Sequence, residues 1–456
     1  MKNGLRATLK HKANIKFRLK DYFFHCFIFG YYCKFNGKRD MGPSRTYPLF
    51  FDYFCDQSSI KGIIMRFRDI PGREDIATRL RASVAEERVS HAQLFTGGEG
   101  TGKLAMAMAY AAYINCTAKS DSDSCGECAS CRKADKLIHP DIHFVFPVVR
   151  NSPSYESIVD SNNSERKARS NEPVSDNYIK EWRKLFTVNP FFSLNDWLKH
   201  IHVENAQGLI YAQESAEIIR KLSLKTYESE YKIMIIWLPE RMHPTAANKL
   251  LKMIEEPPGK TLFILVSEEP DHILPTIMSR CQMVHFTGIS REAIFRHLKK
   301  HCELSSEKAE EIAHVANGNL VRAIALADNE ELSGDDLKRF SDLMRAAWKR
   351  DLSALIRWAD ESSTTGREAQ KNFLVYGLGL LRGNYIMNHN GGERKLTFMT
   401  NREVSFSEKF HPWVNNRNIG RLYKEFNSAH QHIESNGNPR IVFLDMALKV
   451  AAHIRR

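Results

Sequence analysis

Short apolar runs alternate with amphipathic stretches along the chain from Met65 onward. An apolar run bounded by turn residues predicts a buried strand, whereas apolar residues that repeat every three to four positions predict a helix. The strands expected on this basis cover residues 92–97 (AQLFTG), 139–149, 232–238 (KIMIIWL) and 261–267 (TLFILVS). Strands that alternate with helices in this way predict an α/β domain.

The remaining pattern is helical. One helix is expected over 103–114, directly after the first strand, and another over 244–256. Pro244 stands near the start of the second helix, where proline is tolerated, and Pro257 follows its end. Two or three short helices are expected over 288–330, with Gly318 breaking the run, and longer helices from about 333 to the end.

Two segments depart from this pattern. Residues 150–177 are polar and predict an exposed stretch, part of an insertion of roughly 148–200 for which no function is derived. Residues 1–64 are rich in aromatics without a helical period, and their apolar run is shorter than the roughly 20 residues of a membrane span. They are interpreted as an upstream over-extension or a disordered tail, and recognisable domain sequence begins at Met65.

The net charge adds little to this interpretation of the chain. The net charge of +12 would suit a polyanionic partner. Residues 1–64 contain twelve Lys/Arg and four Asp, however, so they carry +8, and the other 392 residues carry only +4. The distribution therefore gives weak support for nucleic-acid binding by the body of the protein.

A glycine-rich loop follows the first strand. Residues 97–103 read GGEGTGK, which has the full GxxxxGK spacing. Such a loop turns its backbone N–H groups around phosphate oxygens and points a helix N-terminus at them. The candidate nucleotide-binding residues are Gly97, Gly100, Thr101, Gly102 and Lys103, with Lys103 beside the β- and γ-phosphates. A chance glycine-rich turn is the alternative, and the preceding strand argues against it.

The residues that hydrolysis needs are missing at two places. Leu104 stands where a Ser or Thr hydroxyl would hold magnesium. The strand at 232–237 ends in Trp237-Leu238 instead of an acidic pair, and the nearest carboxylate is Glu240. The sequence therefore predicts that this chain does not hydrolyse nucleotide. ATP binding without hydrolysis is left open.

Four of the nine cysteines form a compact group with the spacing Cys116-x8-Cys125-x2-Cys128-x2-Cys131. Four thiolates can close a tetrahedron around zinc and leave no open position for catalysis. This spacing predicts a structural Zn²⁺ site rather than a disulfide framework, and a redox dithiol is the alternative. The nearby His139-Pro140-Asp141 is interpreted as a turn at the start of a strand.

Together these motifs resemble the AAA+ subunits of the bacterial DNA polymerase III clamp loader. The cysteine group after the loop helix, NKLLKMIEEPP (248–258) and LPTIMSRC (274–281) carry the resemblance, which covers residues 65–330 well. It implies a RecA-like α/β AAA+ P-loop domain (65–287) with an inserted zinc module (116–131). A helical lid (288–332) and an all-α C-terminal collar domain for oligomerisation (333–456) would follow.

Within the family, Leu104, Trp237 and Leu238 are similar to the delta-prime type, which does not hydrolyse ATP. The resemblance implies that Arg280 is an arginine finger, acting in trans on the ATP of a neighbouring subunit. A guanidinium supplied in trans can stabilise the charge of phosphoryl transfer. The resemblance also places Arg322 near the nucleotide. The alternative for Arg280 is a solvated or structural arginine, and the alternative for Arg322 is a plain surface arginine.

The implied function is to complete the clamp-loader assembly that loads the sliding clamp in DNA replication. The implied partners are the motor (gamma/tau) and delta subunits, the clamp and primer–template DNA, in a cytoplasmic hetero-oligomer without membrane contact. Two alternatives are an active motor-type ATPase in which Glu240 replaces the lost acid, and a zinc-dependent DNA-binding module. The zinc segment is poor in Lys and Arg, which argues against the second. Nothing suggests the acceptor site that a P-loop kinase would need.

Overall fold

The computed structural model describes residues 65–150, 172–203, 206–302, 304–328, 332–390 and 397–455. Residues 1–64 and much of the polar segment therefore lie outside the described residues. Within them, no helix is both long enough and apolar enough to cross a membrane.

Five parallel strands form one sheet in the described residues, in the order β2-β3-β4-β1-β5. They are β1 (Ala92–Thr96), β2 (Ile142–Val145), β3 (Lys232–Trp237), β4 (Thr261–Ser267) and β5 (Gln282–His285). β1, β3 and β4 are buried at every position, as expected for parallel strands covered on both faces. The four strands expected from the sequence are confirmed, and β5 is an additional edge strand.

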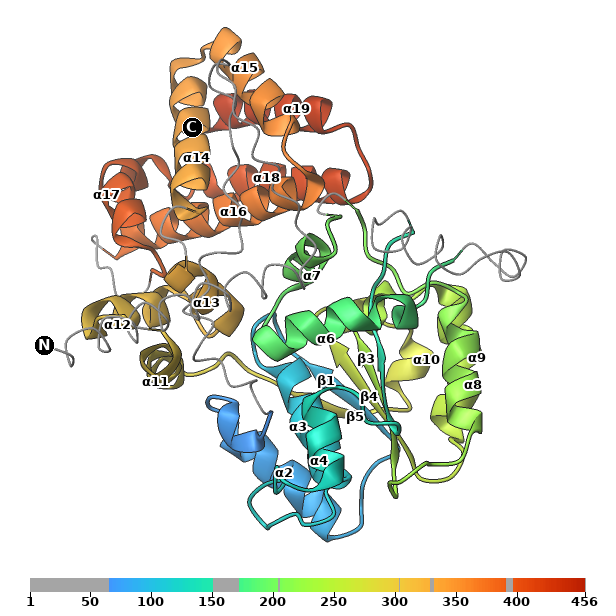
Figure 1. Cartoon of the computed structure of the whole chain (residues 1–456). Coiled ribbons are helices and arrows are strands. Elements are labelled where there is room, and N and C mark those ends of the chain that lie inside the picture. The colour runs from blue at the N-terminus through green and yellow to red at the C-terminus, as the bar shows by residue number, and fades with distance from the viewer. Residues whose placement is uncertain are drawn as a thin grey trace, which may run out of the picture. The chain divides into compact units, whose positions relative to one another are not determined.

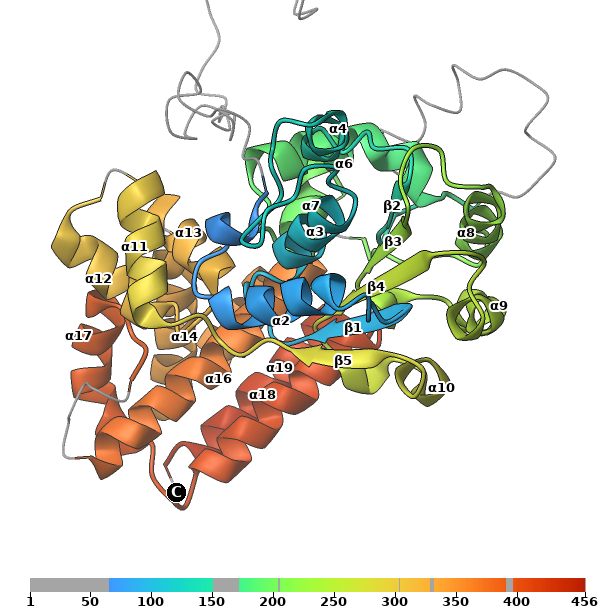
Figure 2. The same ribbon diagram turned by 90° about the horizontal axis from the view of Figure 1, so that it is seen from below.

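Helices cover both faces of the sheet (Figures 1 and 2). Side chains alternate along a strand, so Ile233 and Ile235 of β3 face one helical layer while Met234 and Ile236 face the other. The first layer contains α2 (Glu74–Ala85), α3 (Lys103–Ile114), α4 (Ala129–Asp135), α6 (Ile179–Val188) and α7 (Leu194–His200). The second contains α8 (Glu214–Ser223), α9 (Pro244–Glu255) and α10 (Pro275–Met278). The α/β expectation is confirmed, including the helices at 103–114 and 244–256.

The part of the 148–200 insertion that follows the polar stretch 150–177 forms α6 and α7 and packs into the core. Trp182 and Trp197, one on each helix, are fully buried. Trp182 stacks on Phe146 at a ring-centroid distance of 4.1 Å, and Trp197 packs edge-on against the same ring at 5.1 Å. The polar composition of residues 150–177 concealed this aromatic core because the tryptophans lie C-terminal to the polar stretch.

The second half of the described chain is helical, as expected. Three short helices, α11 (Arg291–His301), α12 (Ser306–Val315) and α13 (Leu320–Asp328), contribute to the same apolar core as α2 and α3. A separate core contains Phe340, Phe373 and Phe426. Its helices are α14 (Leu332–Lys349), α15 (Leu352–Ser363), α16 (Arg367–His389), α17 (Asn401–Phe410), α18 (Ile419–Glu434) and α19 (Pro439–His453).

Candidate nucleotide and metal sites

The glycine-rich loop joins β1 to α3, as the sequence predicted. Gly97, Gly100 and Gly102 all have positive φ angles (151°, 69° and 81°), which side-chain-bearing residues rarely adopt. Space is also short, because a Cβ on Gly97 would lie 2.2 Å from the carbonyl oxygen of Phe286. The Thr101 hydroxyl donates to the carbonyl of Gly98 at 2.8 Å. The backbone conformation of this loop therefore depends on its glycines.

Lys103 is buried and folds back onto the loop. Its ammonium donates to the carbonyls of Gly97 (2.7 Å) and Gly98 (2.5 Å). Burial lowers the pKa of Lys103, while the charges of Glu268, Glu240 and Glu99 oppose that shift. The positive charge that a phosphate would need is therefore already surrounded by oxygen atoms of this chain.

The structure places apolar side chains where hydrolysis would need magnesium ligands. Leu104 and Trp237 are buried and line a cavity of about 30 Å³ beside the loop. Leu238 adopts a left-handed backbone conformation with φ 56°, an outlier for a bulky residue. Leu238 itself belongs to the apolar core. None of these three side chains can coordinate a metal ion.

Glu240, the carboxylate that follows the end of β3, is hydrogen-bonded to the backbone. One carboxylate oxygen, Oε1, accepts from the backbone N–H groups of Glu268 (2.9 Å) and Glu269 (3.2 Å). The other, Oε2, is buried with no hydrogen-bond partner among the described residues. The side chain therefore fastens the turn after β3 to the loop after β4.

Arg322 is not among the residues that line the cavity beside the loop. The residue is exposed on α13, and its backbone N–H donates to Asn319 Oδ1 at 2.9 Å. Its neighbour Val321 lines the cavity instead. The part of the lid that meets the loop is the start of α13, where the Leu320 N–H donates to the Gly100 carbonyl at 3.0 Å.

Arg280 lies at the amino ends of the parallel strands, whereas the phosphate loop lies at their carboxyl ends. β5 runs parallel to β1, with Gln282 beside Gln93 and His285 beside Thr96. The loop follows Thr96, at the carboxyl end of β1, whereas Arg280 comes just before Gln282, at the amino end of β5. Arg280 therefore cannot reach a phosphate bound to its own chain's loop.

The Arg280 side chain is 33% exposed and makes only weak contacts with its own chain. Its guanidinium donates to the Thr276 carbonyl (2.8 Å) and to Glu255 Oε1 (3.2 Å). An ion pair of this exposure contributes about 0–1 kcal/mol to stability. Another acceptor could therefore replace Glu255 at little cost.

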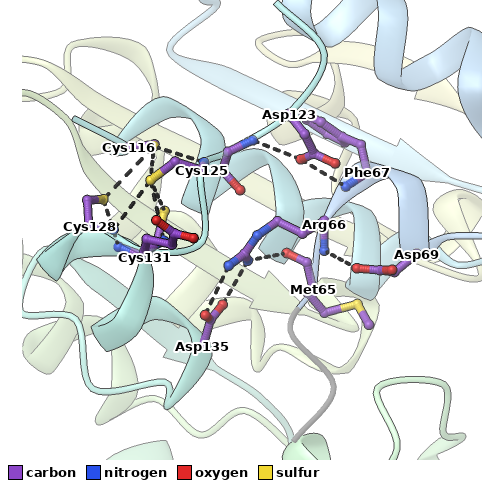
Figure 3. Close-up of polar contacts among 12 residues, drawn as sticks. Met65, Arg66, Phe67, Asp69, Cys116, Asp123, Cys125, Cys128, Cys131 and Asp135 are labelled. Atoms are coloured by element: carbon purple, nitrogen blue, oxygen red, sulfur yellow. Dashed lines mark hydrogen bonds and ion pairs between the residues drawn. The ribbon is translucent and has the colours of Figure 1, made fainter. Parts of the chain in front are cut away.

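The four predicted cysteine ligands converge. Cys116, Cys125, Cys128 and Cys131 place their sulfur atoms within 4.8 Å of one another (Figure 3). Three of the separations are 3.5 Å (116–125), 4.0 Å (116–128) and 3.9 Å (125–131). A tetrahedron of sulfurs at about 2.3 Å from zinc has edges of about 3.8 Å. The geometry therefore fits one zinc ion held by four thiolates.

Backbone N–H groups point at these sulfurs, which favours their thiolate form. Cys125 N–H donates to Cys116 Sγ, Cys128 N–H to Cys125 Sγ and Cys131 N–H to Cys128 Sγ, each at 3.3 Å. Burial opposes ionisation of Cys128, yet the hydrogen bond from the Cys131 N–H and those from Thr117 lower its pKa to about 6. Burial raises the pKa of Cys131. A bound cation would favour the thiolate form of all four.

Comparisons with known proteins show what this chain is similar to. A family model described as "DNA polymerase III, delta subunit" matches residues 72–290. The chain is 28% identical over 279 residues to DNA polymerase III subunit tau of Bacillus subtilis, covering 60% of this chain and 39% of tau. It is 27% identical over 252 residues to subunit delta' of the same organism, covering 55% of this chain and 58% of delta'.

The matched region, residues 72–290, is of the DNA polymerase III clamp-loader type. The chain spans less than two thirds of the length of either relative. A solved structure, a DNA polymerase III gamma subunit-related protein of Thermotoga maritima, has a TM-score of 0.32 and 13% identity. That alignment covers 82% of this chain and 99% of that one.

The cysteine module holds the segment before α2 in place. Arg66 makes a bidentate ion pair with Asp135, the last residue of α4, and Asp123 accepts from the N–H groups of Phe67 (3.3 Å) and Arg68 (3.2 Å) (Figure 3). A Cβ on Gly126 would lie 2.9 Å from the Arg66 guanidinium. The sequence analysis missed these contacts, and no spacing signal could have shown them.

Arg73, which no sequence motif singled out, also contacts the phosphate loop. The Arg73 side chain donates to the carbonyl of Thr101 (2.9 Å) and to that of Thr287. Asn319 donates to Glu99 Oε1 at 3.2 Å. Arg73 thus joins the phosphate loop to the segment after β5, and Asn319 joins it to α13.

His139-Pro140-Asp141 has the structural role expected for it. The Asp141 carboxylate accepts from the N–H groups of Tyr227, Glu228 and Ser229 at 2.7–3.0 Å, which keeps its pKa low even though burial opposes this. His139 Nε2 lies 3.0 Å from the Ser130 hydroxyl. The triplet therefore fixes the loop before β3 and the start of β2.

Proposed function

We propose that this chain is a non-hydrolysing, delta-prime-type AAA+ subunit that completes the clamp-loader assembly and supplies Arg280 to a neighbour's ATP site. One observation carries the proposal. The magnesium-binding positions are filled by Leu104, Trp237 and Leu238, while Arg280 lies at the opposite edge of the same sheet. A chain built in this way can contribute to ATP hydrolysis only through another subunit.

The chemistry of Arg280 suits this role. A guanidinium presents a planar fork of donors that can bind phosphate oxygens, and it stabilises the charge that spreads over them during phosphoryl transfer. Its present acceptors, Thr276 and Glu255, leave it partly exposed. The side chain is therefore available to a γ-phosphate presented by the next subunit.

The zinc ion would be structural. Four cysteines complete its coordination, so no position remains for a substrate or a catalytic water. Cys116, at the end of α3, and Cys131, on α4, would join two helices of the same layer. Zinc bound here would stabilise the arrangement of α3 and α4 and the segment that Arg66 fastens to them.

The proposed assembly follows from the relatives. This subunit would combine with motor subunits (gamma/tau) and a delta subunit, and act with the sliding clamp on primer–template DNA as part of the DNA polymerase III holoenzyme. In this scheme residues 65–287 form the AAA+ domain, 288–332 the lid and 333–456 the collar that joins subunits. Opening and loading of the clamp would be the work of the whole assembly.

Reconstitution with the motor and delta subunits tests the proposal. We would compare wild type with Arg280→Ala, Arg280→Lys, and the matched surface control Arg220→Ala, whose guanidinium pairs with Glu217. Assembly should persist in all four. ATP turnover stimulated by clamp and primed DNA should fall several-fold in both Arg280 variants, because lysine lacks the guanidinium fork, and should be unchanged in the control. Unchanged turnover in Arg280→Ala would remove the arginine-finger role.

Two further measurements address the alternatives. ATP turnover by the purified chain that disappears in Lys103→Ala would identify a motor-type subunit instead. Salt-sensitive DNA binding by the isolated chain that disappears when Cys125 and Cys128 are replaced would identify a zinc-dependent DNA-binding module. The proposed function predicts neither result.

A further inference from the structure

Two tryptophans pack against each other on the surface of the helical C-terminal half. Trp348 lies in the last turn of α14, and Trp413 ends a short 3₁₀ turn, η6 (His411–Trp413), between α17 and α18. Their ring centroids are 4.0 Å apart. Trp413 is 45% exposed, and it is the one exposed tryptophan of the six in the chain. We call Trp348 and Trp413 the tryptophan pair.

Buried amides hold the backbone under Trp413. Asn418 is fully buried, and its Nδ2 donates to the Trp413 carbonyl (2.7 Å) and to the Ile454 carbonyl just after α19 (3.3 Å). Asn388 of α16 donates to the next carbonyl, that of Val414, at 2.9 Å. The exposed indole is therefore held on a fixed support, which lowers the entropy that a partner would lose on binding to it.

A guanidinium lies beside the tryptophan pair. The guanidinium carbon of Arg455 is 4.9 Å from the centroid of the Trp348 ring, and its Nη2 donates to the Trp348 carbonyl. The end of α14, the turn at 411–413 and the residues after α19 thus meet at one place. Arg455 puts a positive charge there, next to an aromatic face.

Four more exposed cations flank the tryptophan pair. Lys349 and Arg350 directly follow Trp348, and Lys409 and Arg417 each stand four residues from Trp413. None of these four cations forms an ion pair with another described residue, and the same is true of Arg455. Their charges are therefore available to an anionic partner.

The carboxylates nearby do not cancel this charge. Asp351 follows Arg350 and caps α15 by accepting from the Ala354 N–H at 3.0 Å, and Glu408 precedes Lys409. Five cations thus stand against two carboxylates, although residues 65–456 carry only +4 in total. The small net charge of the body of the protein conceals a local concentration of positive charge.

An exposed indole among unpaired cations suits a single strand of nucleic acid. Unpaired bases can stack on an aromatic ring face, and cations beside the ring can neutralise the phosphates. The bases of a duplex are already stacked on both faces, so they cannot stack on the ring. An uncharged apolar partner would leave the five cations unused.

We infer that the tryptophan pair and its five flanking cations form a contact site for single-stranded DNA, in which Trp413 stacks on a base and the cations bind the adjoining phosphates. The inference rests on the proposed function for its ligand, because a primer–template junction carries single-stranded template. It adds a DNA contact made by this chain itself, in the helices that follow the sheet and the lid.

Titration of the purified full chain with a labelled oligothymidylate of about 12 nucleotides tests this. The oligonucleotide should bind and quench tryptophan fluorescence, whereas a duplex of the same length should not quench it. Trp413→Ala should weaken binding by about tenfold or more and abolish the quenching, and Trp413→Phe should retain most of the affinity. Tyr227→Ala is the matched control, because Tyr227 is an exposed aromatic residue (81%) before β3. It should bind like wild type.

The double variant Lys409→Ala/Arg417→Ala tests the phosphate contacts without changing a ring. The slope of log affinity against log salt concentration should become shallower by about 1.4, since each phosphate contact to a single strand contributes about 0.7. Arg88→Ala, whose exposed guanidinium pairs with Glu86, should leave the slope unchanged. This comparison decides the question if Trp413→Ala does not fold.

Four results would overturn the inference. They are equal affinity of wild type and folded Trp413→Ala, as binding through the basic residues 1–64 alone would give; an unchanged salt slope in the double variant; quenching by the duplex equal to that by the single strand; and binding that is lost when Cys125 and Cys128 are replaced but not in Trp413→Ala.

A protein partner is the remaining occupant to separate. Assembly with the other subunits that fails in Trp413→Ala, with unchanged DNA affinity, would make the tryptophan pair a protein contact and also overturn the inference. Arg280→Ala should bind the oligonucleotide like wild type. Failure of the DNA contact and failure of the arginine-finger role are therefore measured separately.

Discussion

Arg66 and Asp135 form a bidentate ion pair, with Nη1–Oδ1 at 2.8 Å and Nη2–Oδ2 at 3.0 Å. The two side chains are 1% and 15% exposed. The pair joins the segment before α2 to the end of α4, the helix that carries Cys131 (Figure 3). The same segment continues into Arg73, which donates to the phosphate loop at Thr101. The cysteine module and the phosphate loop are thus connected by a short stretch of chain.

Replacing Arg66 with Met should destabilise the protein by about 3–5 kcal/mol, because it leaves the Asp135 carboxylate partly buried without its partner. Urea unfolding followed by tryptophan fluorescence measures the change. Arg88→Ala is the control: its pair with Glu86 is exposed and should be worth at most about 1 kcal/mol. Equal effects of the two variants would contradict the structural role of Arg66.

Removing the metal should destabilise the protein. Elemental analysis of the purified chain should find one zinc per chain, and a strong chelator should lower the melting temperature together with the zinc content. Zinc binding should release protons and weaken as the pH falls, because the ligands must be thiolates. Cys131→Ser should lose the zinc. Cys302→Ser, outside the cluster, should keep it, and equal zinc content in both variants would refute the assignment.

Glu214 predicts a pH dependence of stability. It is fully buried, and burial raises its pKa from 4.5 to about 7, although Ser175 donates to its Oε2 through both N–H (2.7 Å) and hydroxyl (3.1 Å). The folded chain therefore holds this proton more tightly than the unfolded chain. The stabilisation that the Glu214 carboxyl contributes is fully present below pH 4.5 and is lost as the pH rises to about 7.

Glu214→Gln should remove this dependence. Compared with wild type, the variant should gain stability on the order of 3 kcal/mol between pH 4.5 and pH 7. The free energy of unfolding of both proteins, measured across that range, gives the difference. Glu217→Gln on the same helix is the control and should change by at most about 1 kcal/mol. A flat difference for Glu214→Gln would show that folding does not raise the pKa of this carboxyl.

Gly97 and Gly98 should differ sharply on replacement by alanine. Gly97 has φ 151°, and its Cβ would collide with the carbonyl of Phe286, so Gly97→Ala should cost about 2 kcal/mol or more. Nothing lies within 4 Å of a Cβ on Gly98, so Gly98→Ala should change stability by at most about 0.5 kcal/mol. Urea midpoints of the two variants measure the difference. Equal midpoints would mean that the loop relaxes around the added methyl group.

The sequence by itself determined the features that depend on short spacings. The apolar runs of β1, β3 and β4, the positive-φ glycines and the convergence of the four cysteines follow from chemistry within a few residues. The loss of magnesium ligands at Leu104 and Trp237 is likewise readable from residue type alone. These features are local, so their physical causes lie within the motif itself.

Only the tertiary structure decided which distant residues meet at the sites. Arg66 contacts Asp135 across 69 positions, Arg73 reaches Thr287 across 214, and Phe191 lies against the phosphate loop. Arg280 lies at the amino ends of the strands, away from the phosphate loop, because β5 pairs in parallel with β1. No residue spacing specifies that pairing. Such contacts depend on how the whole chain packs, because apolar burial and ion pairing depend on distance in space and not on separation in sequence.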